Sequence, residues 1–305
     1  MIGYLARRIL LAVPALLGVA TIVFVAVRVL PGDPARVMLG DVATQDQVNR
    51  ARHELGLDLP LPLQYGTFLL QLAHGDFGRS ISTGDPVVAD IALRLPYTLE
   101  LAVLATLVGA IAGITLGVLA ALRQGRVSDL VISFLSVSGM SMPTYWLGLM
   151  LIILFAVNLQ WLPASGAADP QGAILPALTL SVLSIALVAR MTRAAMLEVL
   201  SQDYLRTAKA KGLPKRTIVI KHALRNAMLP IMTAIGLQFG TLLGGAVLTE
   251  SVFGWPGMGR LLVDSIVARD YPVTQGCVLV FSAGFILVNV LIEVLYSAVD
   301  PRITH

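Results

Sequence analysis

Residues 9–30 read ILLAVPALLGVATIVFVAVRVL, and Arg28 is the one charged side chain in this run. The hydrocarbon core of a bilayer is about 30 Å thick, and a helix needs roughly 20 apolar residues to cross it. The apolar region of a secretory signal peptide is shorter, about 7–15 residues, and no small-residue cleavage site follows this run. We therefore predict an uncleaved membrane-spanning helix behind the pair Arg7-Arg8.

The composition of the whole chain is typical of a membrane protein. Of the 305 residues, 56% are hydrophobic and only 13% are charged, and the mean hydropathy is +0.81. A soluble domain usually has about 25% charged residues, so these few charges could not cover a soluble surface. The single cysteine, Cys277, excludes a disulfide framework, and the four histidines have no metal-ligand spacing.

Five further apolar stretches are long enough to cross a bilayer, and together with the first they predict an all-α polytopic protein with six transmembrane helices. They cover about 98–122, 130–157, 174 to beyond Arg193, 227–250 and 273–299. The stretch 130–157 is longer than a bilayer requires and contains Pro143. We therefore expect this helix to tilt or to kink at the proline.

The distribution of Lys and Arg orients these six spans. With the N-terminus inside, about twice as many basic residues lie on the inside as on the outside, and nine lie between Arg190 and Arg225. The positive-inside rule therefore predicts that both termini are cytoplasmic. Membrane orientation thus explains the net charge of +4 better than nucleic-acid binding does.

The segment 31–97, which follows the first span, is predicted to be a structured outer element. Thr44 and Gln47 form a capping-box pattern, and Gly56 is placed to end the helix that begins there. A second short helix is expected over about 62–73. The element is either a lid packed over the bundle or a docking surface for an external protein, and the sequence leaves both open.

The loop between the fourth and fifth spans, residues 201–226, reads SQDYLRTAKAKGLPKRTIVIKHALRN. Ser201 is a typical N-cap, and Asp203 lies in the first turn, where a helix dipole favours negative charge. Gly212 predicts the end of that helix, and Pro214 predicts the start of the next. We therefore expect a cytoplasmic helix-turn-helix.

Topology alone explains the sign of the charge in this loop but not its small residues. Ala208, Ala210 and Gly212 are spaced so that another protein could approach the backbone closely. We interpret the helix over 201–212 as a docking helix for a cytoplasmic partner. The residues expected to make this contact are Tyr204, Arg206, Thr207, Ala208, Lys209, Lys211 and Gly212.

The chain has no motif that would supply energy or catalysis. No G-x-x-x-x-G-K-[ST] loop occurs that could hold nucleotide phosphates, and no catalytic constellation is present. Ionisable residues in the predicted spans are few, namely Arg28, Glu100 and Glu293. Because transporters coupled to protons or sodium usually place such groups near the midplane, we expect energy to enter from a partner.

Span five has Gly236, Gly240 and Gly244 on one helical face. Such a face favours close helix packing, and it could alternatively line a path for solute. Gln238 lies in the same span, and Met142 precedes the proline of span three. The candidates for a translocation path are Met142, Gln238, Gly240 and Gly244.

Residues 203–213, DYLRTAKAKGL, and 222–230, HALRNAMLP, resemble the EAA loop of binding-protein-dependent ABC importer permeases, in particular the dipeptide/oligopeptide permease family. Thr207 and Ala208 stand where the name-giving Glu-Ala-Ala is found in other branches. The likeness covers the whole chain and resembles the first of the family's two permease subunits. It also includes PGDP at 31–34, GDFG at 75–78, LPYTLE at 95–100, MP at 142–143, WLG at 146–148, FGWPGMG at 253–259 and DPR at 300–302.

The resemblance implies a partner set in a bacterial inner membrane: a homologous second permease, two cytoplasmic ATPase subunits that bind ATP and Mg²⁺, and an external solute-binding protein. It implies that this chain is no enzyme, binds no cofactor and forms half of a path for di- or oligopeptides, coupled to an ATPase through 201–212. Alternatives are a nickel chelate, an oligosaccharide, glutathione or an opine as solute, or a secondary transporter acting alone. The expected division is 1–97, the first span with its external helical segment, and 98–305, a core permease domain.

Overall fold

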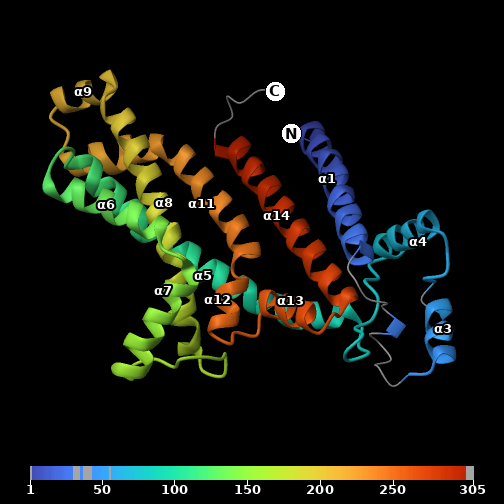
Figure 1. Cartoon of the computed structure of the whole chain (residues 1–305). Helices are drawn as coiled ribbons and strands as arrows, with labels where there is room; N and C mark the ends of the chain where they lie inside the picture. Colours follow the sequence, from blue (N-terminus) through green and yellow to red (C-terminus); the bar gives the residue numbers. More distant parts are fainter. Residues whose placement is uncertain (1, 30–34, 37–42, 55, 300–305) are drawn as a thin grey trace.

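The computed structural model describes residues 2–29, 35–36, 43–54 and 56–299, and the regular elements in these ranges are all helices. The motifs at 31–34 and 300–302 lie outside them. Five helices carry apolar stretches long enough to cross a membrane (Figure 1). They are α1 (Ile2–Val29), α5 (Val87–Leu122), α8 (Ile174–Leu200, preceded by the 3-10 turn Pro170–Ala173), α11 (Arg225–Gly245) and α14 (Tyr271–Val299).

The third predicted span is not one tilted or kinked helix but two separate helices. It consists of α6 (Val127–Ser141) and of α7 (Thr144–Leu151), which continues as a π-helical segment to Asn158, and the two parts are bent by 104°. Pro143 restricts the residue before it, and Met142 is extended with ψ of 130°, so the helix cannot continue. Counted as one crossing, this pair brings the described residues to the six predicted spans.

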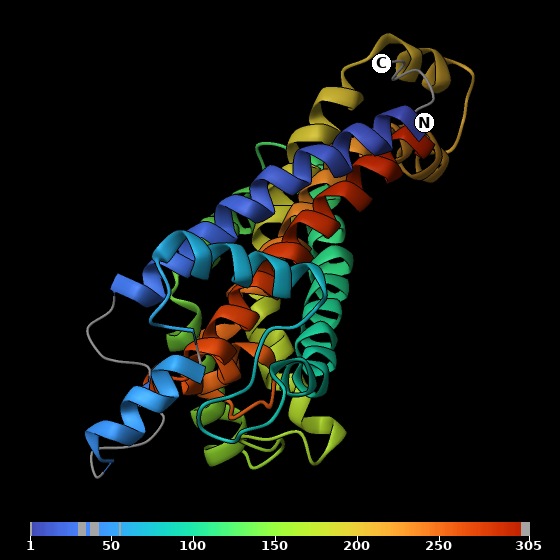
Figure 2. The same cartoon turned by 90° about the vertical axis from the view of Figure 1, so that its right-hand side faces the viewer.

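The bent pair passes from one end of the bundle to the other. Asp129, in the first turn of α6, bonds to Arg193 near the end of α8. Gly148 of α7, in contrast, lies beside Thr179, near the start of α8. Figures 1 and 2 show the start of α1 and the last turns of α14 at the same end as the helix α9 (Asp203–Ala210).

The helix α5 begins at Val87, earlier than the expected start at 98, so the expected division at residue 97 falls inside a helix. α5 packs closely on α8 through Gly109, Gly113 and Gly117, which are spaced four residues apart. A Cβ added to Gly109 or to Gly117 would lie 2.5 Å from the Cβ of Ser184 or Thr192, respectively. This is the small-residue packing that brings membrane helices into contact.

The outer segment contains α3 (Gln45–Glu54) and α4 (Leu61–Ala73), joined by a turn in which Gly56 has φ of +65°. The Thr44 N–H donates to Gln47 Oε1 at 2.9 Å, and the Gln47 N–H donates to Thr44 Oγ1 at 3.4 Å, which is the predicted capping box. α4 does not lie over the bundle as a lid but packs beside α1, where Phe24 contacts two of its rings.

The predicted fifth span ends earlier than residue 250. α11 stops at Gly245, and the separate short helices α12 (Val247–Val252) and α13 (Met258–Val267) follow at the end of the bundle away from α9 (Figure 1). The loop 253–257 between them carries most of the FGWPGMG motif.

Candidate functional site

The loop between α8 and α11 folds as α9, a glycine turn and a second helical segment. That segment consists of α10 (Lys215–Thr217) and the π-helix Ile218–Leu224, and it runs directly into α11. Gly212 has φ of +75°, which is the left-handed conformation that ends a helix, and its N–H donates to Lys209 O at 3.0 Å. Pro214 directly precedes α10.

Ser201 does not cap α9, so that prediction is wrong. Its backbone continues the helical turn at the end of α8, and its hydroxyl donates to Glu198 O at 2.7 Å. Serine hydroxyls often bond back to the preceding turn in this way. Gln202 precedes α9 and provides no side-chain cap, so α9 has eight residues and is shorter than expected.

One face of α9 anchors the helix to its own chain. Leu205 is completely buried and Ala208 is 8% exposed, in a cluster that includes Met196 of α8 and Ile218 of the second segment. The methyl group of Ala208 packs inside the chain, so we expect its exposed neighbours on α9 to make the predicted partner contact. The small size of Ala208 lets α9 lie close to the segment beneath it.

The other face of α9 and the turn that follows it are exposed, and they carry the remaining residues of the predicted contact. These are Tyr204, Arg206, Thr207, Lys209, Lys211 and Gly212. The Tyr204 hydroxyl accepts a hydrogen bond from Asn226 Nδ2 at 2.7 Å, which ties this face to the first turn of α11. The ion pair between Arg206 and Asp203 is fully solvated at 3.3 Å and adds little stability.

A bidentate ion pair joins α6 to α8 on the same side of the molecule. Arg193 donates from Nε to Asp129 Oδ1 at 2.6 Å and from an Nη to Oδ2 at 2.8 Å. The Gly125 N–H donates to the same carboxylate at 3.0 Å, and Asp129 is only 3% exposed. Such paired bonds are strong and directional. From the sequence, Arg193 indicated only the orientation of the chain, although a charge pair at two helix ends is a usable signal.

The opposite end of the bundle is held by Glu250, which is completely buried. Its carboxylate accepts from Thr98 Oγ1 at 2.7 Å and from the Arg260 N–H at 3.0 Å, and the Met258 N–H donates to Thr98 Oγ1 at 2.8 Å. Gly257 lies so close that an added Cβ would collide with the carboxylate. The FGWPGMG motif is therefore closed over a buried acid, which sequence reasoning missed.

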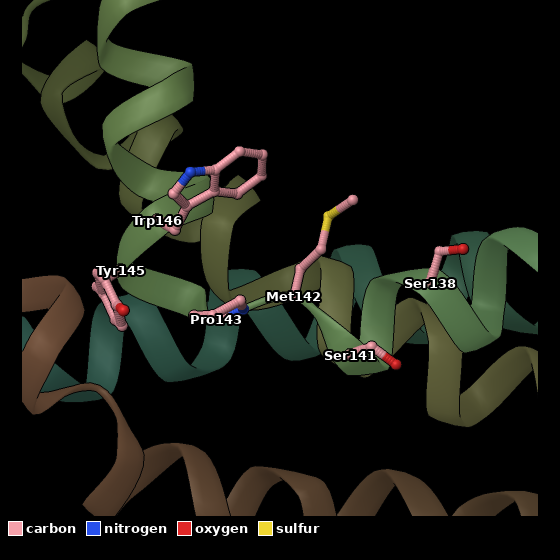
Figure 3. Close-up of a pocket in the computed structure, with 6 residues that line it drawn as sticks. All are labelled: Ser138, Ser141, Met142, Pro143, Tyr145 and Trp146. Carbon is pink, nitrogen blue, oxygen red and sulfur yellow. The ribbon is translucent and has the colours of Figure 1, made fainter.

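The break between α6 and α7 forms a concave surface, and the hollow that it lines has a volume of about 480 Å³. It is lined by Ser138, Ser141, Met142, Pro143, Tyr145 and Trp146 (Figure 3). Met142, a predicted path residue, is 44% exposed there. The lining provides hydroxyl groups, aromatic rings and a thioether, and none of these six side chains carries a charge.

The other predicted path residues all belong to α11. Gln238 is 7% exposed, and Gly240 is buried, where an added Cβ would lie 3.2 Å from the ring of Phe285 of α14. Gly236 packs on Ile292 of the same helix. Gly244 is exposed and has no neighbour within 4 Å of an added Cβ. The glycine face of α11 therefore packs against α14 at Gly236 and Gly240, and at Gly244 it is not covered by the described residues.

Comparison with known proteins finds two family descriptions that match this chain. Residues 113–305 match the family described as the binding-protein-dependent transport system inner membrane component, and residues 1–102 match the N-terminal region of such membrane components. The chain belongs to this family of ABC importer permeases. It is therefore a multi-pass protein of the inner membrane and a permease subunit, not an enzyme. Membership implies an ATPase and a binding protein as partners.

Individual relatives match over their full length. The chain is 46% identical over 305 residues, 100% of both proteins, to the glutathione transport system permease protein GsiC of Salmonella typhi, and equally to that of Escherichia coli strain K12. The fold is similar to inward-facing structures of the MetNI methionine ABC transporter, with a TM-score of 0.61 and 19% identity over 69% of this chain and 96% of that one. An amino acid ABC transporter solved with histidines gives a TM-score of 0.54 at 18% identity, over 68% and 93%.

Proposed function

We propose that this permease forms half of the translocation path for a short peptide, together with a homologous second permease. We further propose that α9 seats on one of two cytoplasmic ATPase subunits. The observation that carries the coupling role is the division of α9 into a buried face around Leu205 and an exposed polar face around Thr207 and Lys209. A tether between spans needs no helix with one anchored face and one exposed polar face.

The anchoring of α9 explains how movement of an ATPase would reach the spans. Leu205 belongs to the same buried cluster as Met196 of α8, and the Tyr204 hydroxyl is hydrogen-bonded to Asn226 of α11. Because α9 is tied to two spans at once, a displacement of the helix shifts the ends of α8 and α11 together. Ion pairing through Asp129 and Arg193 passes the shift to α6. The path would then alternate between outward and inward openings.

In this scheme α9 and both termini lie in the cytoplasm, and the ATPase subunits hold ATP and Mg²⁺, so this chain binds no cofactor. The orientation is supported by the basic residues gathered near α9, among them Lys209, Lys211 and Lys215. The end of the bundle with α13 and the outer segment would face the solute-binding protein.

The solute is proposed to be a short peptide, and glutathione is the individual candidate to test first. Glutathione is a tripeptide, and the relatives at 46% identity are named for its transport. The concave surface at Met142 has no charged lining residue to hold a charged terminus tightly. This surface would bind a passing solute only weakly, so the selection of the solute would be left to the binding protein.

The coupling proposal is tested with the complete importer in proteoliposomes, by measuring ATP hydrolysis stimulated by loaded binding protein. Lys209→Glu reverses a charge on the exposed face of α9, and we expect stimulation to fall at least tenfold. Arg126→Glu, an exposed charge reversal before α6, is the matched control and should retain it. Equal stimulation in both variants would overturn the proposal.

The identity of the solute is tested by measuring the uptake of labelled glutathione, a dipeptide and an opine by the unaltered complex. Uptake of the opine alone would contradict a peptide solute.

A further inference from the structure

The helix α4 has no charged residue from Leu61 to Ala73, although it lies outside the spans. Its sequence, LPLQYGTFLLQLA, is as apolar as a membrane helix but too short to cross a bilayer. The neighbouring α3 is the opposite: its sequence QDQVNRARHE is mostly charged or polar, and Val48 is buried among those of its side chains that the structure describes. The two helices therefore suit different surroundings.

One face of α4 is fixed on the last turns of α1. The Tyr65 hydroxyl shares a 2.6 Å hydrogen bond with Thr21, and the Phe24 ring lies 5.1 Å from the Tyr65 ring and 5.4 Å from the Phe68 ring. Figure 1 shows α4 projecting from this point on the side of α1 away from α14, and Figure 2 shows it crossing in front of α1.

The crossing point lies at the depth of a lipid leaflet. The apolar span of α1 covers Leu10–Val29, 20 residues, which matches the thickness of a bilayer core. Thr21 precedes Val29 by two helical turns, about 12 Å along the axis. Half of the bilayer core is about 15 Å thick, so α4 meets α1 within one leaflet and not above the membrane.

The polar boundary is marked by Arg28. Its guanidinium carbon lies 3.4 Å from the centre of the Phe24 ring, and Nε donates to Gln64 Oε1 at 3.0 Å. A further guanidinium nitrogen donates to Phe24 O at 3.3 Å, so the side chain lies back along α1 by one turn and Gln64 provides a polar partner for its charge. The first turn of α4 therefore lies at the level of this charge near the end of the span, and Phe68 in a later turn lies beside the Phe24 ring.

The face of α4 turned away from α1 is apolar and uncovered by the described residues. Leu63 is 59% and Leu70 is 62% exposed, and they lie seven residues apart with Gly66 between them. Thr67 and Gln71 form a polar flank beside this face. On α1, the adjacent exposed stripe of Ile22, Val25 and Val29 continues the apolar surface.

We propose that α4 is a membrane-interface helix, with its Leu63–Leu70 face in the acyl chains of one leaflet and its Thr67–Gln71 flank toward headgroups and water. Lipid fits this face because the exposed leucines continue the lipid-facing surface of α1 at the same depth, where a soluble protein has no access. With the orientation proposed above, the leaflet is the outer one. α4 then holds α3, with its charged surface, at the edge of the membrane.

Nitroxide labels on the complete importer in nanodiscs of phosphatidylethanolamine and phosphatidylglycerol test this assignment. Single cysteines replace Leu63, Leu70, Gln71 and Asn49 in a Cys277→Ser background, and collision with oxygen is compared with collision with a water-soluble nickel chelate. We expect oxygen to be favoured severalfold at the two leucine positions, and the chelate to be favoured at Asn49 of α3 and, as the matched neighbour, at Gln71. Co-purification of the partner subunits verifies that each variant assembles.

Each alternative occupant gives a different result. Free access of the chelate to a label at Leu70 would place this face in water, and shielding from both reagents would place it against the partner permease. Protection that begins only when binding protein is added would assign the face to that protein. Any of these three results overturns the lipid assignment. The readout does not involve transport, so it stands apart from the test of coupling.

Discussion

The helix α9 and the loop around Glu250, at opposite ends of the bundle, use polar side chains in opposite ways. At the α9 end, Arg206, Thr207 and Lys209 are exposed above a small anchor of buried Leu205. At the α13 end, Glu250 is completely buried, and its carboxylate is bonded to Thr98 and to the backbone of Arg260. One end therefore presents a surface, and the other is closed on itself. In the proposed scheme, the α9 end is the surface that the ATPase moves, and the α13 end is the fixed frame.

Removal of the buried carboxylate should give the largest loss of stability. Glu250→Ala leaves the Thr98 hydroxyl and the Arg260 N–H without their acceptor and opens a cavity, at a cost of about 3–5 kcal/mol. Thermal unfolding in detergent measures the change. Glu198→Ala, at an exposed position near α9, is the matched control and should cost less than about 0.5 kcal/mol. Similar losses in both variants would remove the contrast between the ends.

Breaking the ion pair between α6 and α8 should give the second-largest loss of stability. Arg193→Ala leaves the buried Asp129 carboxylate with only the Gly125 N–H and a distant Ser133 hydroxyl. Because the Arg193 side chain is 31% exposed, we expect about 2–3 kcal/mol, below the range for fully buried pairs. The double variant Asp129→Asn with Arg193→Met should recover part of this loss. Full additivity of the two single changes in unfolding experiments would show that the pair does not act as a unit.

Changes at the glycine turn should be smaller in stability but large in coupling. Gly212 has φ of +75° with open space around it, so Gly212→Ala should cost only the left-handed strain, about 1–2 kcal/mol. Gly212→Pro cannot adopt this φ at all, so it should reorient α9 and abolish stimulation of the ATPase while the protein still inserts. Normal transport by the proline variant would contradict the coupling role.

The sequence predicted most of this fold because membrane helices are recognised from apolar length. The bounds of α4, α8 and α14 lie within a few residues of their expected ranges, and the capping box at Thr44 and Gln47 was a purely local pattern. The start of α5 was misplaced, because the helix begins at Val87, eleven residues before the expected apolar stretch, and continues through Pro96.

The remaining features depend on contacts between distant residues. Thr98 and Glu250 are 152 positions apart, and Asp129 and Arg193 are 64 apart, so no local periodicity indicates either pair. Ser201 shows another limit, because a serine between two helices suits the end of one as well as the start of the next. The sequence also did not indicate which face of α9 is buried. Only the packing of the second helical segment against α9 shows that Ala208 points inward.

The most direct test of the coupling claim is a cysteine crosslinking scan of α9 in the complete importer, in a Cys277→Ser background. The structure changes the expected pattern from a continuous stretch to one face. Cysteines that replace Thr207, Lys209 and Lys211 should form disulfides with cysteines on an ATPase subunit, and those that replace Leu205 and Ala208 should not. Absence of crosslinks from the exposed face, or crosslinks from Ala208 in their place, would contradict the docking of α9.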